Sequence, residues 1–66
     1  MYRNGQPLTE DKHFHDHVNC DVPVQIYLEK SHNDIGYVEK IGPQYIKVNN
    51  TFYNRKFYTF VSRPGY

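Results

Sequence analysis

The residues best suited to chemistry are three histidines that alternate along one short segment. They are His13, His15 and His17, with Asp16 between the last two and Cys20 three residues further on. Imidazole, thiolate and carboxylate groups are the ligands that zinc takes in four-coordinate sites. In a helix, His13 and His17 would share one face. The preferred interpretation is a solvated polar tail with no cofactor, and the alternative is a transition-metal site.

No arrangement typical of a catalytic centre is found in the sequence. Serine, histidine and aspartate occur without a nucleophile motif, and the seven acidic residues are scattered without a pair suited to general acid–base catalysis. Cys20 is the single cysteine, so a disulfide within the chain is excluded. It is expected to be a free thiol, with an intermolecular disulfide as the alternative. We therefore predict that this protein is not an enzyme.

A second set of candidate residues combines tyrosines with basic side chains. Four expected strands each carry one tyrosine on the side away from their aliphatic residues: Tyr27, Tyr37, Tyr45 and Tyr53. The simpler explanation is that tyrosine rings cover neighbouring side chains in sheets. The functional explanation is a binding surface, since aromatic residues are enriched at interfaces. Basic residues lie close by in the sequence, so the rings could also stack on bases while these residues meet phosphates: Lys40, Lys47, Arg55 and Lys56.

The last expected strand is apolar on both faces. Phe57, Thr59 and Val61 would form one side, and Tyr58 and Phe60 the other. Such a strand either lies between two layers or pairs with a second subunit, because an uncovered apolar edge promotes aggregation. We predict a homo-oligomer in which Phe57, Tyr58 and Phe60 mediate self-association.

The elements that must position these residues are β-strands. The 66 residues include seven tyrosines and four phenylalanines but no alanine, a composition that favours sheet over helix. Residues 24–29 alternate between aliphatic side chains and polar or tyrosine side chains, which is the two-residue period of a half-buried strand. Five strands are expected, at residues 23–30, 35–41, 45–48, 51–53 and 57–61.

These strands predict an all-β fold, a small five-stranded antiparallel SH3-like or Sm-like barrel over residues 23–66. The short connections make consecutive strands antiparallel. Asn49-Asn50 is expected to form a two-residue hairpin turn, because asparagine tolerates positive φ. The predicted interior consists of Val24, Ile26, Leu28, Val38, Ile46, Val48 and Phe52, with Ile41 and either Phe57 or Phe60 at the ends.

Residues 1–22 are predicted to form a flexible, poorly structured polar arm. Asn4-Gly5 and Pro7 are turn signals. A helix over residues 8–18, capped by Thr9, is weakened by three histidines and two aspartates. No apolar leader and no segment of membrane-spanning length is present, so a cytoplasmic location without a membrane partner is expected. The net charge of +1 requires no strongly charged partner.

Three stretches resemble the Sm-like and SH3-like small barrels. Residues 23–28 and 35–38 are similar to their first strand and glycine-containing second strand, and residues 58–64 look like the end of the bacterial Sm-like RNA chaperones. This resemblance implies a five-stranded barrel and RNA binding. The lysine–histidine pair of those chaperones corresponds here to Lys56-Phe57, which departs from the RNA-binding pattern.

A further resemblance is to a family of short uncharacterised proteins of endospore-forming bacilli. It rests on Ile41-Gly42-Pro43-Gln44-Tyr45-Ile46-Lys47-Val48-Asn49-Asn50-Thr51-Phe52-Tyr53 and on Phe60-Val61-Ser62-Arg63-Pro64-Gly65-Tyr66. It implies a bacterial protein linked to the spore and transfers no site residues. Taken together, the sequence predicts a non-catalytic, self-associating structural or adaptor module, with single-stranded RNA or DNA binding and metal binding as the alternatives.

Overall fold

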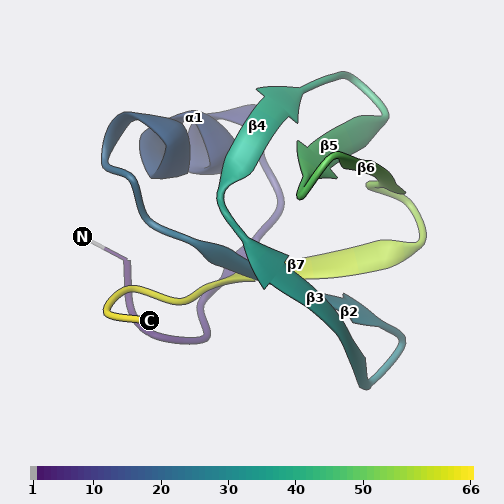
Figure 1. The fold of residues 1–66 in the computed structure, drawn as a ribbon, viewed down its shortest axis with the longest axis horizontal. Coiled ribbons are helices and arrows are strands. Elements are labelled where there is room, and N and C mark those ends of the chain that lie inside the picture. Colours follow the sequence, from purple (N-terminus) through teal and green to yellow (C-terminus); the bar gives the residue numbers. More distant parts are fainter. Residues whose placement is uncertain (1) are drawn as a thin grey trace.

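The computed structural model describes residues 2–66, which form seven strands and one helix (Figure 1). In chain order the elements are β1 (Pro7–Leu8), α1 (Asp11–Asn19), β2 (Val24–Leu28), β3 (Ser31–Gly36), β4 (Val38–Ile41), β5 (Tyr45–Val48), β6 (Thr51–Asn54) and β7 (Tyr58–Ser62). The helix has nine residues, and no helix within residues 2–66 is long and apolar enough to cross a membrane.

The strands form two antiparallel sheets. The first has the order β1-β7-β2-β3, and the second has the order β4-β5-β6. β3 and β4 belong to different sheets, yet only Tyr37 separates them, so the chain passes directly from one sheet into the other (Figure 1). The β-rich class predicted from the sequence is confirmed. The predicted count of five strands in one barrel is not what the structure contains, since it has seven strands in two sheets.

The β5–β6 hairpin forms around the predicted asparagine turn. Asn49 and Asn50 have φ values of 50° and 64°, and Val48 lies directly opposite Thr51. Positive φ at both central residues is typical of the type I′ turn, whose twist matches that of the flanking strands. The turn therefore sets the register of the second sheet, because it places Tyr53 opposite Ile46.

The core lies between the two sheets and beneath α1. Six predicted interior residues are buried: Val24, Ile26, Val38, Ile46, Val48 and Phe60. Two predictions are wrong, since Leu28 and Phe52 are exposed, and of the alternatives Phe57 and Phe60 it is Phe60 that is buried. Leu28 ends β2 at a turn, and Phe57 lies in the loop before β7. Phe52 faces outward because the hairpin register gives the inward position to Tyr53, which is only 5% exposed. Ile41 is half-buried and packs against the core.

The predicted flexible arm is wrong, because residues 7–8 form β1 and residues 11–19 form α1. Leu8 on β1 and Phe14 on α1 are both in the core. The start of the helix is stabilised by a histidine side chain, a residue type that sequence patterns do not favour there. His13 Nδ1 accepts hydrogen bonds from the backbone N–H groups of Thr9 and Glu10, at 3.0 and 3.1 Å. These bonds satisfy donors that a helix start leaves unpaired, so a histidine that weakens the helix pattern supports this helix.

Candidate functional site: the outer face of the second sheet

Four side chains gather on the outer face of the β4-β5-β6 sheet, and we name this set the aromatic–lysine face. Its members are Lys40, Tyr45, Lys47 and Phe52. Ile46 and Val48 point into the core, so their neighbours on β5 must point outward. Lys47 lies between Lys40 on β4 and Phe52 on β6 in the strand pairing.

The rings of this face contact one another and leave a broad surface open. Tyr45 and Phe52 meet edge to face, with ring centroids 4.9 Å apart. The Lys47 ammonium lies 5.3 Å from the Phe52 centroid, within the range of a cation–π contact. Phe52 remains 56% exposed. Tyr45 covers Gly42 so closely that a Cβ there would lie 2.7 Å from the ring, so glycine is needed for this packing.

The charges of this region are uncompensated within residues 2–66. Lys40 lies directly opposite Lys47, and like charges at such positions destabilise a sheet. The only salt bridges among these residues join Lys12 to Asp16 and Arg55 to Asp11. The face therefore combines an aromatic surface with positive charge that has no acidic partner of its own.

Two of the four predicted surface tyrosines form hydrogen bonds within the protein through their hydroxyl groups. Tyr53 is buried and donates its hydroxyl to Asp34 Oδ2 at 2.7 Å. Tyr27 lies half-buried on the first sheet, where its hydroxyl accepts Arg63 Nη2 at 3.1 Å. Tyr37 is exposed at the β3–β4 junction. Only Tyr45 of the four belongs to the aromatic–lysine face, so the prediction of one tyrosine surface is wrong.

Arg55 holds the helix rather than offering its charge to a ligand. Its Nη1 donates to Asp11 Oδ1 at 2.6 Å and to the Gly42 carbonyl at 2.9 Å. The guanidinium lies 5.0 Å from the Phe14 ring centroid. The predicted role of Arg55 in the binding surface is therefore wrong, whereas Lys56 is exposed on the neighbouring turn.

The predicted self-association residues divide between surface and core. Phe57 is 62% exposed, Tyr58 is half-buried, and Phe60 is buried against Phe14 with ring centroids 5.3 Å apart. β7 lies between β1 and β2, which means that both of its edges are paired within the chain. Phe60 is buried, so its predicted part in self-association is wrong, whereas Phe57 remains accessible.

The three histidines do not converge on a metal site. His13 Nδ1 accepts backbone N–H groups, His15 is exposed, and His17 is buried. Within residues 2–66, no group of three histidine, cysteine, aspartate or glutamate side chains is placed to hold an ion. Cys20 is a free thiol exposed just after α1. The predicted ligand set is thus wrong, because the helix points alternate residues in different directions.

His17 and Ser62 form a pair that sequence reasoning missed. His17 Nε2 lies 2.7 Å from Ser62 Oγ, and His17 Nδ1 lies 2.6 Å from the carbonyl oxygen of His13. A carbonyl only accepts, so Nδ1 carries the proton and Ser62 donates its hydroxyl to Nε2. This resembles the nucleophile–base contact of hydrolases. However, Ser62 is fully buried, and the carboxylate of Asp16 binds Tyr2 instead of His17. The pair therefore docks α1 on β7.

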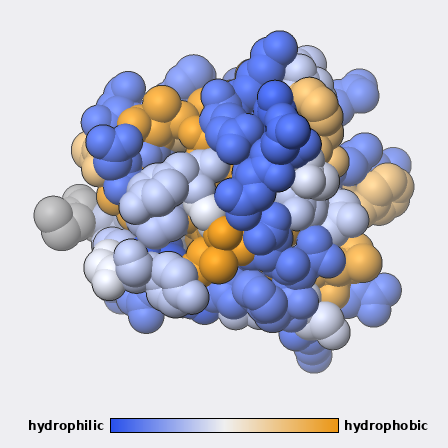
Figure 2. Space-filling model, in the orientation of Figure 1, coloured by the Kyte–Doolittle hydropathy of each residue, from blue (hydrophilic) through white to orange (hydrophobic). Residues whose placement is uncertain are grey.

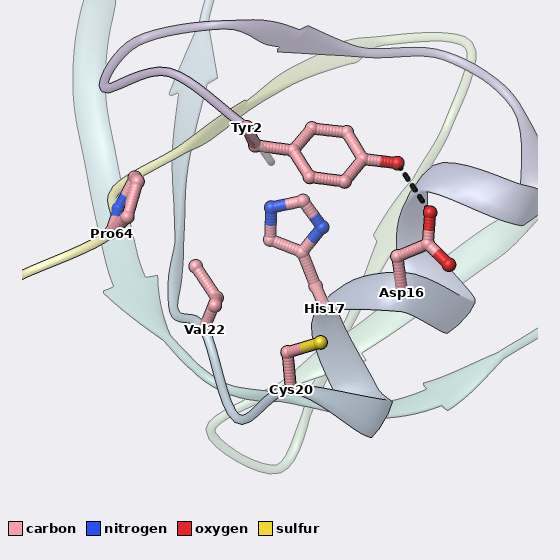
Figure 3. A pocket seen from close by; sticks show the side chains of 6 residues that line it. All are labelled: Tyr2, Asp16, His17, Cys20, Val22 and Pro64. Carbon is pink, nitrogen blue, oxygen red and sulfur yellow. Dashed lines mark hydrogen bonds between the residues drawn. The ribbon is translucent and has the colours of Figure 1, made fainter.

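A mainly apolar pocket of about 290 Å³ lies beside this pair (Figure 3). The Tyr2 ring lies across the His17 ring, with centroids 4.5 Å apart. The Tyr2 hydroxyl donates to Asp16 Oδ2 at 2.7 Å. This hydrogen bond raises the pKa of Tyr2 to about 12 and, together with Lys12, lowers the pKa of Asp16. These contacts hold residues near the N-terminus against the helix. The Cys20 thiol also lines the pocket, on the same side as the His17 ring.

A second internal cluster joins the two sheets and was also missed. Asp34 on β3 accepts hydrogen bonds from Tyr53 on β6, from the Ile35 N–H and from Asn49 Nδ2. Asn49 also donates to the Ile35 carbonyl at 2.9 Å. A Cβ on Gly36 would lie 2.7 Å from the Asn49 side chain, so glycine makes room for this bond. The sequence did contain a signal for this cluster. The asparagine turn sets the register of β6, and that register turns Tyr53 inward.

Comparisons with protein-family models, with curated proteins and with solved structures give no match to this chain. The candidate site therefore rests on its own geometry. The face of the molecule in Figure 2 is largely hydrophilic and is interrupted by small hydrophobic patches.

Proposed function

We propose that this protein is a non-catalytic, self-associating binding module whose binding surface is the aromatic–lysine face. The observation that carries this proposal is that Phe52 lies 56% exposed on an ordered strand, with Tyr45 and Lys47 in contact with it. Exposed aromatic rings supported by a rigid sheet supply contact area at low cost in side-chain entropy. Phe57 and Tyr37 add further exposed aromatic surface.

The one hydroxyl that is paired with a histidine ring among residues 2–66 is that of Ser62, and it is buried. A buried hydroxyl cannot reach a substrate without opening the helix–sheet interface. The His17–Ser62 pair is therefore structural in this proposal, and the proposed function is carried by the exposed aromatic–lysine face.

The finer fold assignment that we propose is a bent relative of the SH3-like and Sm-like barrels. If β3 and β4 are counted as one strand bent at Tyr37, the order becomes β1-β7-β2-β3/β4-β5-β6, with α1 between β1 and β2 in the chain. This strand order supports the resemblance to the SH3-like and Sm-like barrels that the sequence shows within residues 23–64. A link to the spore of endospore-forming bacilli stays a prediction from the sequence.

Self-association is tested by light scattering across a range of concentrations. The mass is expected to rise above the 7.9 kDa of one chain between low micromolar and millimolar protein. Val18→Ser is the matched control, because it removes an exposed apolar side chain on α1, away from the proposed face. It should leave the mass unchanged. A mass of 7.9 kDa at every concentration would remove self-association from the proposed function.

Single-stranded nucleic acid is a second candidate partner, and the uncompensated Lys40–Lys47 pair favours it. Strand-borne aromatic rings stack on bases, and lysines flanking them meet phosphates. Lys56, exposed on the turn after β6, adds a third positive charge close to this sheet. The Tyr45 and Phe52 rings would supply the stacking surface.

A salt-dependent titration with a fluorescent single-stranded oligonucleotide tests this second function. For single strands, each phosphate contact contributes about −0.7 to the slope of log affinity against log salt. K40A/K47A removes two such contacts, so its slope should be less negative by about 1.4. F52A should cost about 1–3 kcal/mol of binding if a base stacks there. Lys12→Ala is the control, because Lys12 lies on α1 and pairs with Asp16. Binding that is insensitive to salt, or equally weakened by the control, contradicts the hypothesis.

A further inference from the structure

β6 differs from the other strands that end a sheet in having an unprotected edge. The outer strands of the two sheets are β1, β3, β4 and β6. β1 contains Pro7 and has only two residues, and β3 carries Asp34. β4 carries Glu39 and Lys40, and its pairing is irregular at that point. Proline, charge and bulges are the features by which sheet edges avoid pairing with other chains, and β6 has none of them.

The backbone of Phe52 points its hydrogen-bonding groups out from this edge. Around a two-residue turn, hydrogen-bonded pairs alternate with non-bonded ones, beginning with Val48 and Thr51. The next bonded pairs are therefore Ile46 with Tyr53 and Gln44 with Arg55, and the Arg55 N–H does donate to the Gln44 carbonyl at 2.9 Å. It follows that the N–H and C=O of Phe52 face away from β5.

We infer that β6 pairs with β6 of a second copy of this chain across a two-fold axis that passes beside Phe52. In that antiparallel register, each Phe52 N–H donates to the Phe52 carbonyl of the other copy. Thr51 then lies opposite Tyr53 of the second copy, so no charged residue opposes another along Thr51–Tyr53. Because β6 can pair with itself in this register, the partner strand at its free edge is identified as β6 of a second copy of this chain.

The pairing would join two three-stranded sheets into one of six strands. Strand addition gains affinity from main-chain hydrogen bonds, and the exposed Phe52 rings would come side by side on the outer face. The two aromatic–lysine faces would then form one continuous surface. Because the shared edge is short, the association is expected to be weak, and it is best measured at high concentration. This inference rests on the proposed self-association and specifies its interface.

Opposite charges at the axis give the sharpest test. F52E and F52K are each expected to give 7.9 kDa by analytical ultracentrifugation at concentrations where the wild-type chain is a dimer. An equimolar mixture of the two should recover twice that mass, because only a two-fold axis places residue 52 of one copy against residue 52 of the other. Val18→Glu and Val18→Lys are controls at an exposed apolar residue on α1, outside β6, and should dimerise like the wild type.

The outcomes separate this interface from the broader function. A wild-type chain that stays at 7.9 kDa contradicts self-association itself. Three results would contradict the two-fold interface but not self-association. F52E could leave the wild-type oligomer intact, the oligomer could contain three or more copies, or the mixture of F52E and F52K could fail to restore the dimer. Amide exchange on the wild-type chain gives a readout without substitution: the Phe52 N–H should slow with rising concentration, whereas those of Thr51 and Tyr53 should not. Equal behaviour of the three amides overturns the inference.

Discussion

Replacing Phe14 with alanine is expected to leave the chain unfolded or barely folded at room temperature. Phe14 is 1% exposed and packs between Phe60 and the Arg55 guanidinium. Truncating a buried phenylalanine costs about 3–5 kcal/mol. A single core in a domain of this size rarely supplies more than about 3–5 kcal/mol, so the loss consumes most of the stability. Urea unfolding followed by circular dichroism measures it.

Phe57→Ala is the matched control for this variant. Phe57 is 62% exposed, and surface substitutions usually change the free energy of unfolding by no more than about 0.5 kcal/mol. If F14A proved as stable as F57A, α1 would not belong to the cooperative core. The flexible arm predicted from the sequence would then be the better description of residues 1–22.

Tyr53→Phe is expected to destabilise the protein by about 1.5–3 kcal/mol, the usual worth of a hydrogen bond to a charged group. The change removes the hydroxyl that donates to Asp34 at 2.7 Å while keeping the buried ring. Tyr45→Phe is the control, since it removes a hydroxyl from the adjacent strand at a position outside this cluster. Equal stability of the two variants would show that the Asp34 cluster does not hold the sheets together.

The same variant should change how stability depends on pH. The Tyr53 hydroxyl, followed by the Ile35 N–H and Asn49, lowers the pKa of Asp34 below its ordinary 3.8. A lowered pKa in the folded state contributes stability above pH 3.8 that is lost as the pH falls through the folded value. The wild-type chain should therefore lose stability below about pH 4, and Y53F should lose less. Asp16 titrates in the same direction, so some acid sensitivity should remain. An unchanged profile in Y53F would contradict this coupling.

Local patterns in the sequence determined most of the second sheet. The asparagine turn and the alternation of Ile46 and Val48 are short-range signals, because each depends on residues only a few positions apart. Tyr45 and Lys47 were predicted to face away from the core for this reason, and they do so. Phe52 was predicted in the core, and Tyr53 on the surface. Counting the register outward from the turn would have corrected this, since a shift of one residue exchanges the two faces of a strand.

Only the tertiary structure decided what residues 2–22 do. The polar segment with three histidines has weak helix propensity, yet α1 forms because Phe14 and His17 are buried on one side and Arg55 binds Asp11 at its first turn. Ser62, which completes the His17 contact, lies 45 positions away in the sequence. No local pattern can report a partner at that distance.

Local sequence patterns and tertiary contacts determined different features of this protein for a physical reason. Alternation and turn chemistry are set by the geometry of neighbouring residues, so the sequence by itself determined the β-rich class, six core residues and three members of the aromatic–lysine face, Lys40, Tyr45 and Lys47. Burial of polar groups depends on partners brought together by folding. The roles of His17, Asp34, Tyr53 and Arg55 within the fold were therefore decided by tertiary contacts. These contacts bury Tyr53 and bind Arg55 to α1, whereas Phe52 stays exposed.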